Sequence, residues 1–236
     1  MTALADELIK AFPLAEGGAL QIIERRKSEL TVDVANELHT RFKKALEDGD
    51  PNTAYAASML ASVVYLKVGK RYDGLKSMFD SVQVRFMAAG DAAAYDTVRT
   101  AALDCMSKAK QIGANDIAFS AALTAADCAY FAAQACGQSS NDGLLWMRKC
   151  LDGLETAATF AADIGGSAWL VKFASLTAQA TRDAPSLLWL NDKAAIDAQL
   201  HRLAAAAEKS IPIEFRFPND PVKTKNIGQM LAELSY

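Results

Sequence analysis

Apolar positions recur every three or four residues along most of the chain, which is the spacing of one face of an α-helix. Residues 92–112 show the pattern clearly, because Asp96, Arg99, Ser107 and Lys110 all fall on the side opposite the apolar residues. Before residue 210, no segment alternates apolar and polar positions as a half-buried strand would. The pattern predicts an all-α protein with helices at residues 3–11, 17–29, 31–48, 51–68, 72–89, 92–112, 115–136, 142–164, 167–182 and 191–209.

Glycines mark the ends of these predicted helices at positions 49, 69, 90, 113, 137 and 165. Glycine tolerates the left-handed conformation that ends a helix, and residues such as Asp50 and Asp91 commonly cap the next one. Short connections make successive helices antiparallel neighbours, so we expect stacked helical hairpins with a period of about 42 to 50 residues. Two architectures fit this expectation, namely an open or mildly curved solenoid and a closed up-and-down bundle.

The composition supports a globular helical chain. Alanine, the best helix former, supplies about a fifth of the 236 residues, and no proline lies between residues 52 and 184. Hydrophobic residues make up 51% of the chain, and 25 basic against 28 acidic residues give a net charge of −3. The basic clusters are local and are matched by acids, so we expect no nucleic-acid partner.

The most apolar window, Ile117 to Cys136, contains Asp127 and Gln134, and we interpret it as a buried central helix rather than a membrane span. The four cysteines, at 105, 128, 136 and 150, lack the spacing of zinc or redox motifs and indicate buried, reduced thiols. The first residues are acidic where a signal peptide needs basic ones. These observations predict a cytoplasmic protein without an export signal.

One hairpin carries a recognisable motif, over about residues 52–89. Small Ser62 and aromatic Tyr65 lie in its first helix, Gly69 marks the turn, and Phe79 and Val82 lie where the second helix packs back. This arrangement resembles a tetratricopeptide repeat (TPR), in which the small residue lets two helices approach and the aromatic fills the space above it.

The hairpin also departs from the TPR pattern. Its turn holds one extra residue, Leu75 replaces the usual alanine, and no proline closes the unit. The hairpins at 92–136 and 142–182 keep the helix-turn-helix plan but exceed the 34-residue TPR unit, so a longer-period helical repeat stays open.

The resemblance implies a TPR-like α-α solenoid that binds a protein or peptide in a groove. In that family the first helices of successive hairpins line the groove, which assigns the helices at 51–68 and 92–112 to it. The candidate partner-binding residues are Met59, Val63, Leu66, Lys67, Asp96, Arg99, Leu103 and Lys110.

We predict no catalytic residue, no cofactor and no metal site. His39 and His201 are the only histidines, and the charged residues around His39 are interpreted as a solvated helix face. Asp127 has two interpretations: it faces water at a helix edge, which we favour, or it is buried with a partner such as Arg99.

The predicted helical domain covers residues 1–210, and residues 211–236 form a tail of different character. Apolar residues at 211, 213, 215 and 217 alternate with polar residues or proline, which predicts an extended segment, and Asp220 with Pro221 is expected to begin a short last helix. The tail either caps the last hairpin or docks in a groove and competes with a partner.

These patterns favour a non-enzymatic adaptor or scaffold that binds a protein or peptide, with self-association left open. The alternative is a regulatory helical domain in which Trp146, Trp169 and Trp189 line a pocket for a small apolar ligand.

Overall fold

The computed structural model describes residues 3–12, 18–137 and 140–161. It also describes short pieces of the C-terminal part, namely 172–173, 176–177, 179–180, 183, 194, 198–199, 201–203, 215–217 and 220–225. The α-helices are α1 (Ala3–Lys10), α2 (Ala19–Arg25), α3 (Val32–Glu47), α4 (Pro51–Lys67), α5 (Arg71–Ala88), α6 (Ala92–Gln111), α7 (Asn115–Cys136) and α8 (Asn141–Ala161). The predicted all-α fold is confirmed.

Two predicted caps and four of the six predicted glycine turns form as expected, whereas Gly90 has no positive φ and Gly165 lies outside the described residues. The Asp50 side chain accepts a hydrogen bond from the Thr53 backbone N–H (3.0 Å), and Asp91 accepts one from that of Ala94 (2.8 Å), so each stabilises a helix start. Glycines with positive φ follow four of the helices, at positions 49, 69, 113 and 137.

Two predicted helices need correction. The predicted helix at 17–29 is two elements, because the chain leaves helical geometry at Arg26 before a 3₁₀ turn, η1 (Lys27–Glu29). Asp220 does not begin a helix, since β2 (Asp220–Lys225) pairs antiparallel with β1 (Phe215–Phe217). The extended conformation predicted around residue 215 is therefore confirmed over β1. Most of the predicted helices at 167–182 and 191–209, and all of 226–236, lie outside the described residues.

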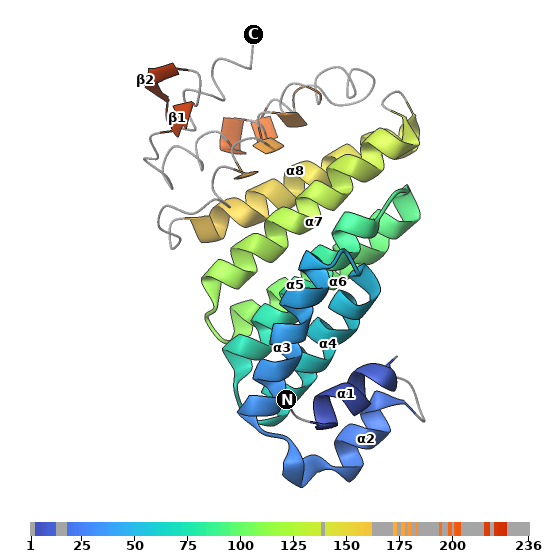
Figure 1. The fold of residues 1–236 in the computed structure, drawn as a ribbon. Coiled ribbons are helices and arrows are strands. Elements are labelled where there is room, and N and C mark those ends of the chain that lie inside the picture. The colour runs from blue at the N-terminus through green and yellow to red at the C-terminus, as the bar shows by residue number, and fades with distance from the viewer. Residues whose placement is uncertain are drawn as a thin grey trace.

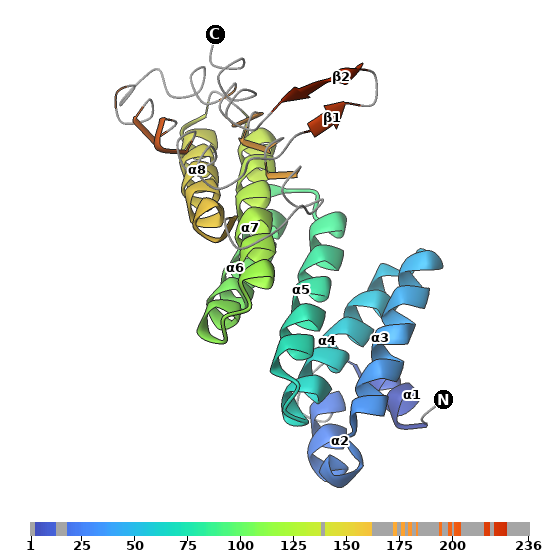
Figure 2. The same ribbon diagram turned by 90° about the vertical axis from the view of Figure 1, so that its left-hand side faces the viewer.

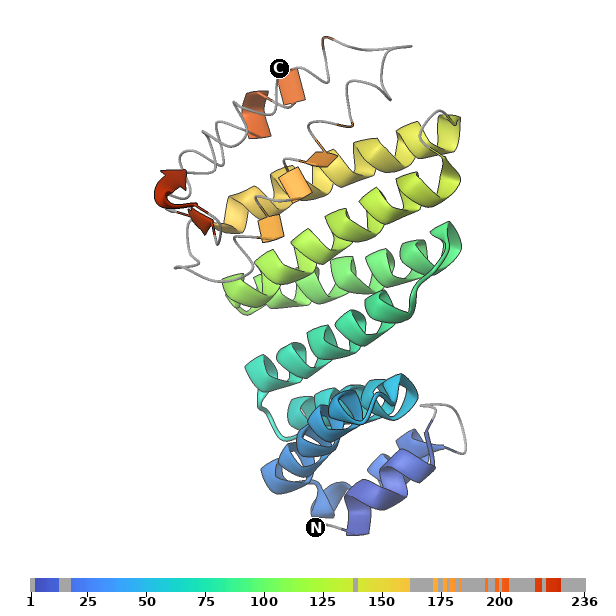
Figure 3. The ribbon, with the colours of Figure 1, turned by 45° about the horizontal axis from the view of Figure 1, so that its top comes forward.

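The helices stack in chain order. In Figure 1, α1 and α2 lie at the lower end of the molecule, and α7 and α8 lie near the upper end. Figures 2 and 3 show α5 between the α3–α4 pair and the α6–α7 pair. Each described helix from α3 to α8 packs against its neighbours in sequence, and α5 also contacts α7. Among the described elements, no extensive contact joins α1–α4 to α7 or α8.

Contacts between alternate helices from α2 to α7 span 41 to 45 residues in sequence. His39 of α3 lies beside Asp80 of α5, 41 residues later, and Gln83 of α5 donates a hydrogen bond to Thr124 of α7, also 41 residues later. Separations of 43 to 47 residues join Glu24 to Lys67, Tyr72 to Asp116, Phe86 to Phe131, Asp127 to Lys172, Asp152 to Gln199 and Glu155 to Arg202. The observed hairpin period is thus longer than the 34-residue TPR unit.

The predicted central helix, α7, is buried on every side, since each residue from Ile117 to Tyr130 is buried. Its many alanines allow both α6 and α8 to pack closely. The tightest contact joins Ala126 to Gly153 of α8, where an added β-carbon would lie 2.9 Å from the Ala126 Cβ.

We predict that Gly153→Ala lowers the free energy of unfolding by about 1–3 kcal/mol, because the new methyl group overpacks the α7–α8 interface. Alanine normally stabilises a helix interior relative to glycine, so the expected sign is opposite to the propensity effect. Gly90→Ala is the control, since nothing lies within 4 Å of its added β-carbon. Urea denaturation of both variants measures the difference, and a stabilised Gly153→Ala would contradict the close packing.

Candidate functional site

Two of the four candidate residues on α4 face α5. The Ser81 hydroxyl donates to Met59 Sδ at 3.1 Å, and Leu66 lies against Gly74, where a β-carbon would come within 2.7 Å of Leu66 Cγ. The other two face the N-terminal helices. Val63 packs against the core formed by α1–α4, while the Lys67 ammonium lies 2.5 Å from Glu24 of α2.

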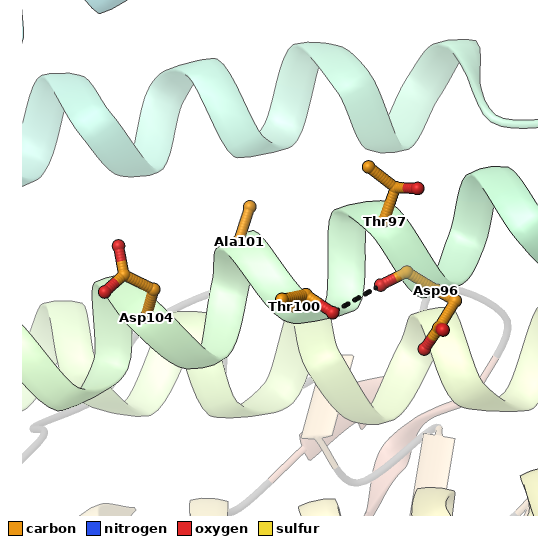
Figure 4. Close-up of a pocket in the computed structure, with 5 residues that line it drawn as sticks. All are labelled: Asp96, Thr97, Thr100, Ala101 and Asp104. Carbon is orange, nitrogen blue, oxygen red and sulfur yellow. Dashed lines mark hydrogen bonds between the residues drawn. The ribbon is translucent and has the colours of Figure 1, made fainter.

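The four candidates on α6 also have different surroundings. Arg99 Nη1 lies 3.8 Å from Asp96 Oδ1. Leu103 packs on the core between α5, α6 and α7, and Lys110 is exposed. Figure 4 shows a shallow depression of about 540 Å³ on this helix, where the Thr100 hydroxyl donates to the Asp96 carbonyl. It is lined by Asp96, Thr97, Thr100, Ala101 and Asp104.

The α4 and α6 candidates lie on helices that are separated by α5. α5 packs against both helices, and α4 and α6 are not in extensive contact with each other. Among alternate helices, α5 contacts α7, and α3 approaches α5 through the side chains of His39 and Asp80.

Helical spacing puts five residues of α5 on one side of that helix, at intervals of three or four. The neighbouring side chains of α3 and α7 complete a surface that we call the α3–α5–α7 face. It consists of His39, Lys43 and Leu46 of α3, Asp73, Lys76, Asp80, Gln83 and Met87 of α5, and Phe131 of α7.

A histidine and a carboxylate lie at the centre of this face. His39 Nδ1 is 3.9 Å from Asp80 Oδ2, and both atoms are buried without a hydrogen-bond partner in the part of the chain that is described. Burial raises the pKa of Asp80 to about 6, although Lys76 and Lys43 oppose the rise. Burial, and then the same two lysines, lower the pKa of His39. Lys43 is exposed, as expected for a charged residue of a solvated helix face, whereas the His39 side chain is half-buried.

Polar contacts tie α5 to α7 along the same face. Gln83 Nε2 donates to Thr124 Oγ1 at 2.7 Å in the middle of the helices, and Tyr72 donates to Asp116 at 2.5 Å near their N-terminal ends. The second hydrogen bond raises the pKa of Tyr72 to about 12, with burial adding to the effect. These contacts fix the position of α5 relative to α7 along the helix axes.

An aromatic cluster forms the other end of the face. The rings of Tyr95 and Phe131 stack with centroids 5.6 Å apart, and Phe86 lies 5.8 Å from Phe131. Phe131 is 40% exposed, and Met87, next to Phe86 in sequence, is 66% exposed. Large apolar surface is therefore left open where α5, α6 and α7 meet.

Asp127 lies behind this aromatic end and is buried, with 8% of its side chain exposed. The favoured prediction of a water-facing carboxylate is wrong, and its partner is Lys172 at 2.6 Å rather than Arg99. The Lys172 ammonium also lies 5.0 Å from the centre of the Phe86 ring. The pKa of Asp127 is raised, because burial outweighs the attraction of Lys172.

The free cysteines of the described helices lie off the face. Burial raises the pKa of both Cys105 and Cys128 to about 12, so these free thiols stay protonated at neutral pH. Among the described residues, no three His, Cys, Asp or Glu side chains are grouped as a metal site would need, and no helix is long and apolar enough to cross a membrane.

Sequence reasoning missed Asp80 and the Phe86–Tyr95–Phe131 cluster, although it selected Asp96 and Arg99 beside the cluster on α6. The available signal was the hairpin period. Adding 41 residues to His39 gives Asp80, and Gly49 and Gly90 are separated by the same interval.

Asp80→Asn is predicted to stabilise the protein at pH 7 by up to about 3 kcal/mol, because the raised pKa means that ionised Asp80 costs folding energy. The native state binds the proton more tightly than the unfolded chain, so this contribution to stability is lost as the pH rises from about 4 to about 6. The variant should show a flatter pH profile in that window by urea denaturation.

Asp104→Asn on α6 is the control, since Asp104 is exposed and its ion pair with Lys108 is worth only a few tenths of a kcal/mol. A destabilised Asp80→Asn with an unchanged pH profile would show that Asp80 is not desolvated as described.

No protein-family model, curated protein or solved structure matches the chain. Its function must therefore be inferred from its own residues and their geometry.

Proposed function

We propose that this chain is a non-catalytic adaptor or scaffold that binds a protein or peptide on the α3–α5–α7 face. The observation that carries the proposal is the exposure of three large apolar side chains on alternate helices. Leu46, Met87 and Phe131 are 39%, 66% and 40% exposed, respectively.

The register of the helices supports placing these three side chains at one end of the face. Leu46 and Met87 are separated by 41 residues, like His39 and Asp80, and Met87 and Phe131 by 44 residues, like Tyr72 and Asp116. Because α3, α5 and α7 run in the same direction, residue pairs with the same separation in sequence have the same offset along the helix axes. Large exposed apolar side chains grouped in this way are typical of protein interaction sites.

The arrangement of the helices is compatible with a TPR-like solenoid. Contacts between alternate helices at separations of 41 to 45 residues, and the lack of extensive contact between α1–α4 and α7 or α8, support an open stack over a closed bundle. The groove in this proposal is lined by α3, α5 and α7, so Met59 and Lys110 are not part of it.

No specific observation favours a small apolar ligand. Trp146 packs against the core and stacks with the Lys149 ammonium 3.7 Å from its ring, while Trp169 and Trp189 lie outside the described residues. A second described depression, of about 500 Å³, lies beside α1, α3 and the start of α4, and Ile9, Glu37 and Arg41 are among the residues that line it. The buried thiols are compatible with the proposed cytoplasmic location.

The test is affinity capture of the full chain from cytosol with Met87→Asp, which places a charge at the apolar end. We expect the main partner of the wild type to bind at least about tenfold more weakly, because the contact would bury an unpaired carboxylate. Leu145→Asp is the matched control, since Leu145 is 54% exposed on α8 and lies off the face.

Both positions are exposed, so both variants should fold like the wild type, within about 0.5 kcal/mol of its stability. A stoichiometric partner that is lost with Leu145→Asp but retained by Met87→Asp would contradict the proposal. Dissociation constants measured with the purified partner decide the outcome.

A further inference from the structure

We infer that the partner segment is acidic as well as apolar, with carboxylates that meet Lys43 and Lys76 and a large apolar side chain that meets Leu46, Met87 and Phe131. The inference rests on the proposed function and names the chemistry of the partner. It follows from the distribution of charge along the α3–α5–α7 face.

Two ammonium groups flank the centre of the face without neutralising partners. Lys43 and Lys76 are exposed, and neither has a carboxylate within 4.0 Å among the described residues. By contrast, Lys67 and Lys108 each lie within 3 Å of one. Both unpaired lysines act electrostatically on His39 and Asp80, which places their charges near the middle of the face.

The acids of the face leave this positive charge exposed. Asp80 interacts electrostatically with both lysines, but its Oδ2 atom is buried and makes no hydrogen bond to either. Asp116 accepts the hydrogen bond of Tyr72, and Asp127 is paired with Lys172. Asp73 lies in the first turn of α5, where the positive end of the helix dipole favours an acid.

The face therefore changes in character from the N-terminal to the C-terminal ends of its parallel helices. Asp73 and Asp116 lie at the N-terminal ends, Lys43 and Lys76 flank the middle, and the apolar residues occupy the C-terminal ends. A segment that complements this order carries its carboxylates on one side of its apolar anchor only.

Helix geometry sets the spacing of the complementary groups. Lys43 precedes Leu46 by three residues, about 5 Å along α3, and Lys76 precedes Met87 by eleven, about 17 Å along α5. A helical partner would match these distances with acidic side chains about one and three turns from the anchor. Phosphate-rich nucleic acid is a poor match, because it offers nothing for the apolar end and the chain carries a net charge of −3.

The experiment is selection of displayed random peptides of about 16 residues, long enough to span both features at helical rise, on the full chain. Its variants are Lys43→Glu/Lys76→Glu, Met87→Asp, and the charge-matched control Lys10→Glu/Lys110→Glu, whose lysines are exposed and off the face. Enriched peptides are then synthesised, and their dissociation constants are measured at low and high salt.

We expect wild-type selections to be enriched in Asp or Glu within about eleven residues of a Leu, Met, Phe or Trp. Lys43→Glu/Lys76→Glu should weaken the binding of these peptides about tenfold or more and reduce its salt dependence, because the affinity and its salt dependence both come from the attraction between the two lysines and the peptide carboxylates. Lys10→Glu/Lys110→Glu should leave their affinity unchanged.

Two other results would overturn the inference, and they separate it from the proposed function. Selected peptides that need Met87 but show no acidic enrichment, or no response to Lys43→Glu/Lys76→Glu, would refute the acidic partner and keep the binding face. Selections that yield no peptide sensitive to Met87→Asp would count against both.

Discussion

The length of the helical hairpins is the constraint on which the rest of the structure depends. Helices α3 to α8 have 16 to 22 residues and are joined by short turns. Every second helix therefore begins at nearly the same level, measured along the helix axes. This register puts His39 beside Asp80 and Gln83 beside Thr124. In our proposal it also gathers the exposed apolar ends of α3, α5 and α7. Close packing around α7 keeps the stack together, because its small side chains let α6 and α8 approach.

Two buried carboxylates, Asp80 on the α3–α5–α7 face and Asp127 behind it, weaken the fold rather than strengthen it. Burial raises the pKa values of Asp80 and Asp127, which means that each carboxylate costs folding energy when ionised. An apolar residue of similar size would avoid this cost at either position. Groups held at a cost in stability are common at functional sites, which agrees with a binding role for the face.

Much of the fold could be predicted from local sequence signals, because helix spacing, caps and glycine turns each act within a few residues. Asp50, Asp91 and four of the glycines act in the structure as these rules predict. The break at Arg26 was missed, since it coincides with long-range ion pairs to Glu7 of α1 as well as to the nearby Glu29. The strand at 220–225 was missed because its partner strand supplies the backbone hydrogen bonds that a local rule would assign to a helix.

The candidate site was harder to predict, because it depends on which helices approach one another. The TPR resemblance assigned the groove to α4 and α6, whereas the face we propose rests on the α5–α7 contact and on the approach of His39 of α3 to Asp80 of α5. Asp127 illustrates the same difficulty, since its partner Lys172 follows 45 residues later on a different segment. Only the hairpin period carried this information, and it had to be combined with side-chain chemistry to find Asp80.

The central claim is that α3, α5 and the C-terminal end of α7 present one binding face. Hydroxyl-radical footprinting of the full chain, with and without a bound partner, tests it most directly by measuring the reactivity of individual exposed side chains. The account predicts that Leu46, Met87 and Phe131 lose reactivity together while Leu145 on α8 keeps it. Protection of Leu145 with Met87 left fully reactive would contradict it.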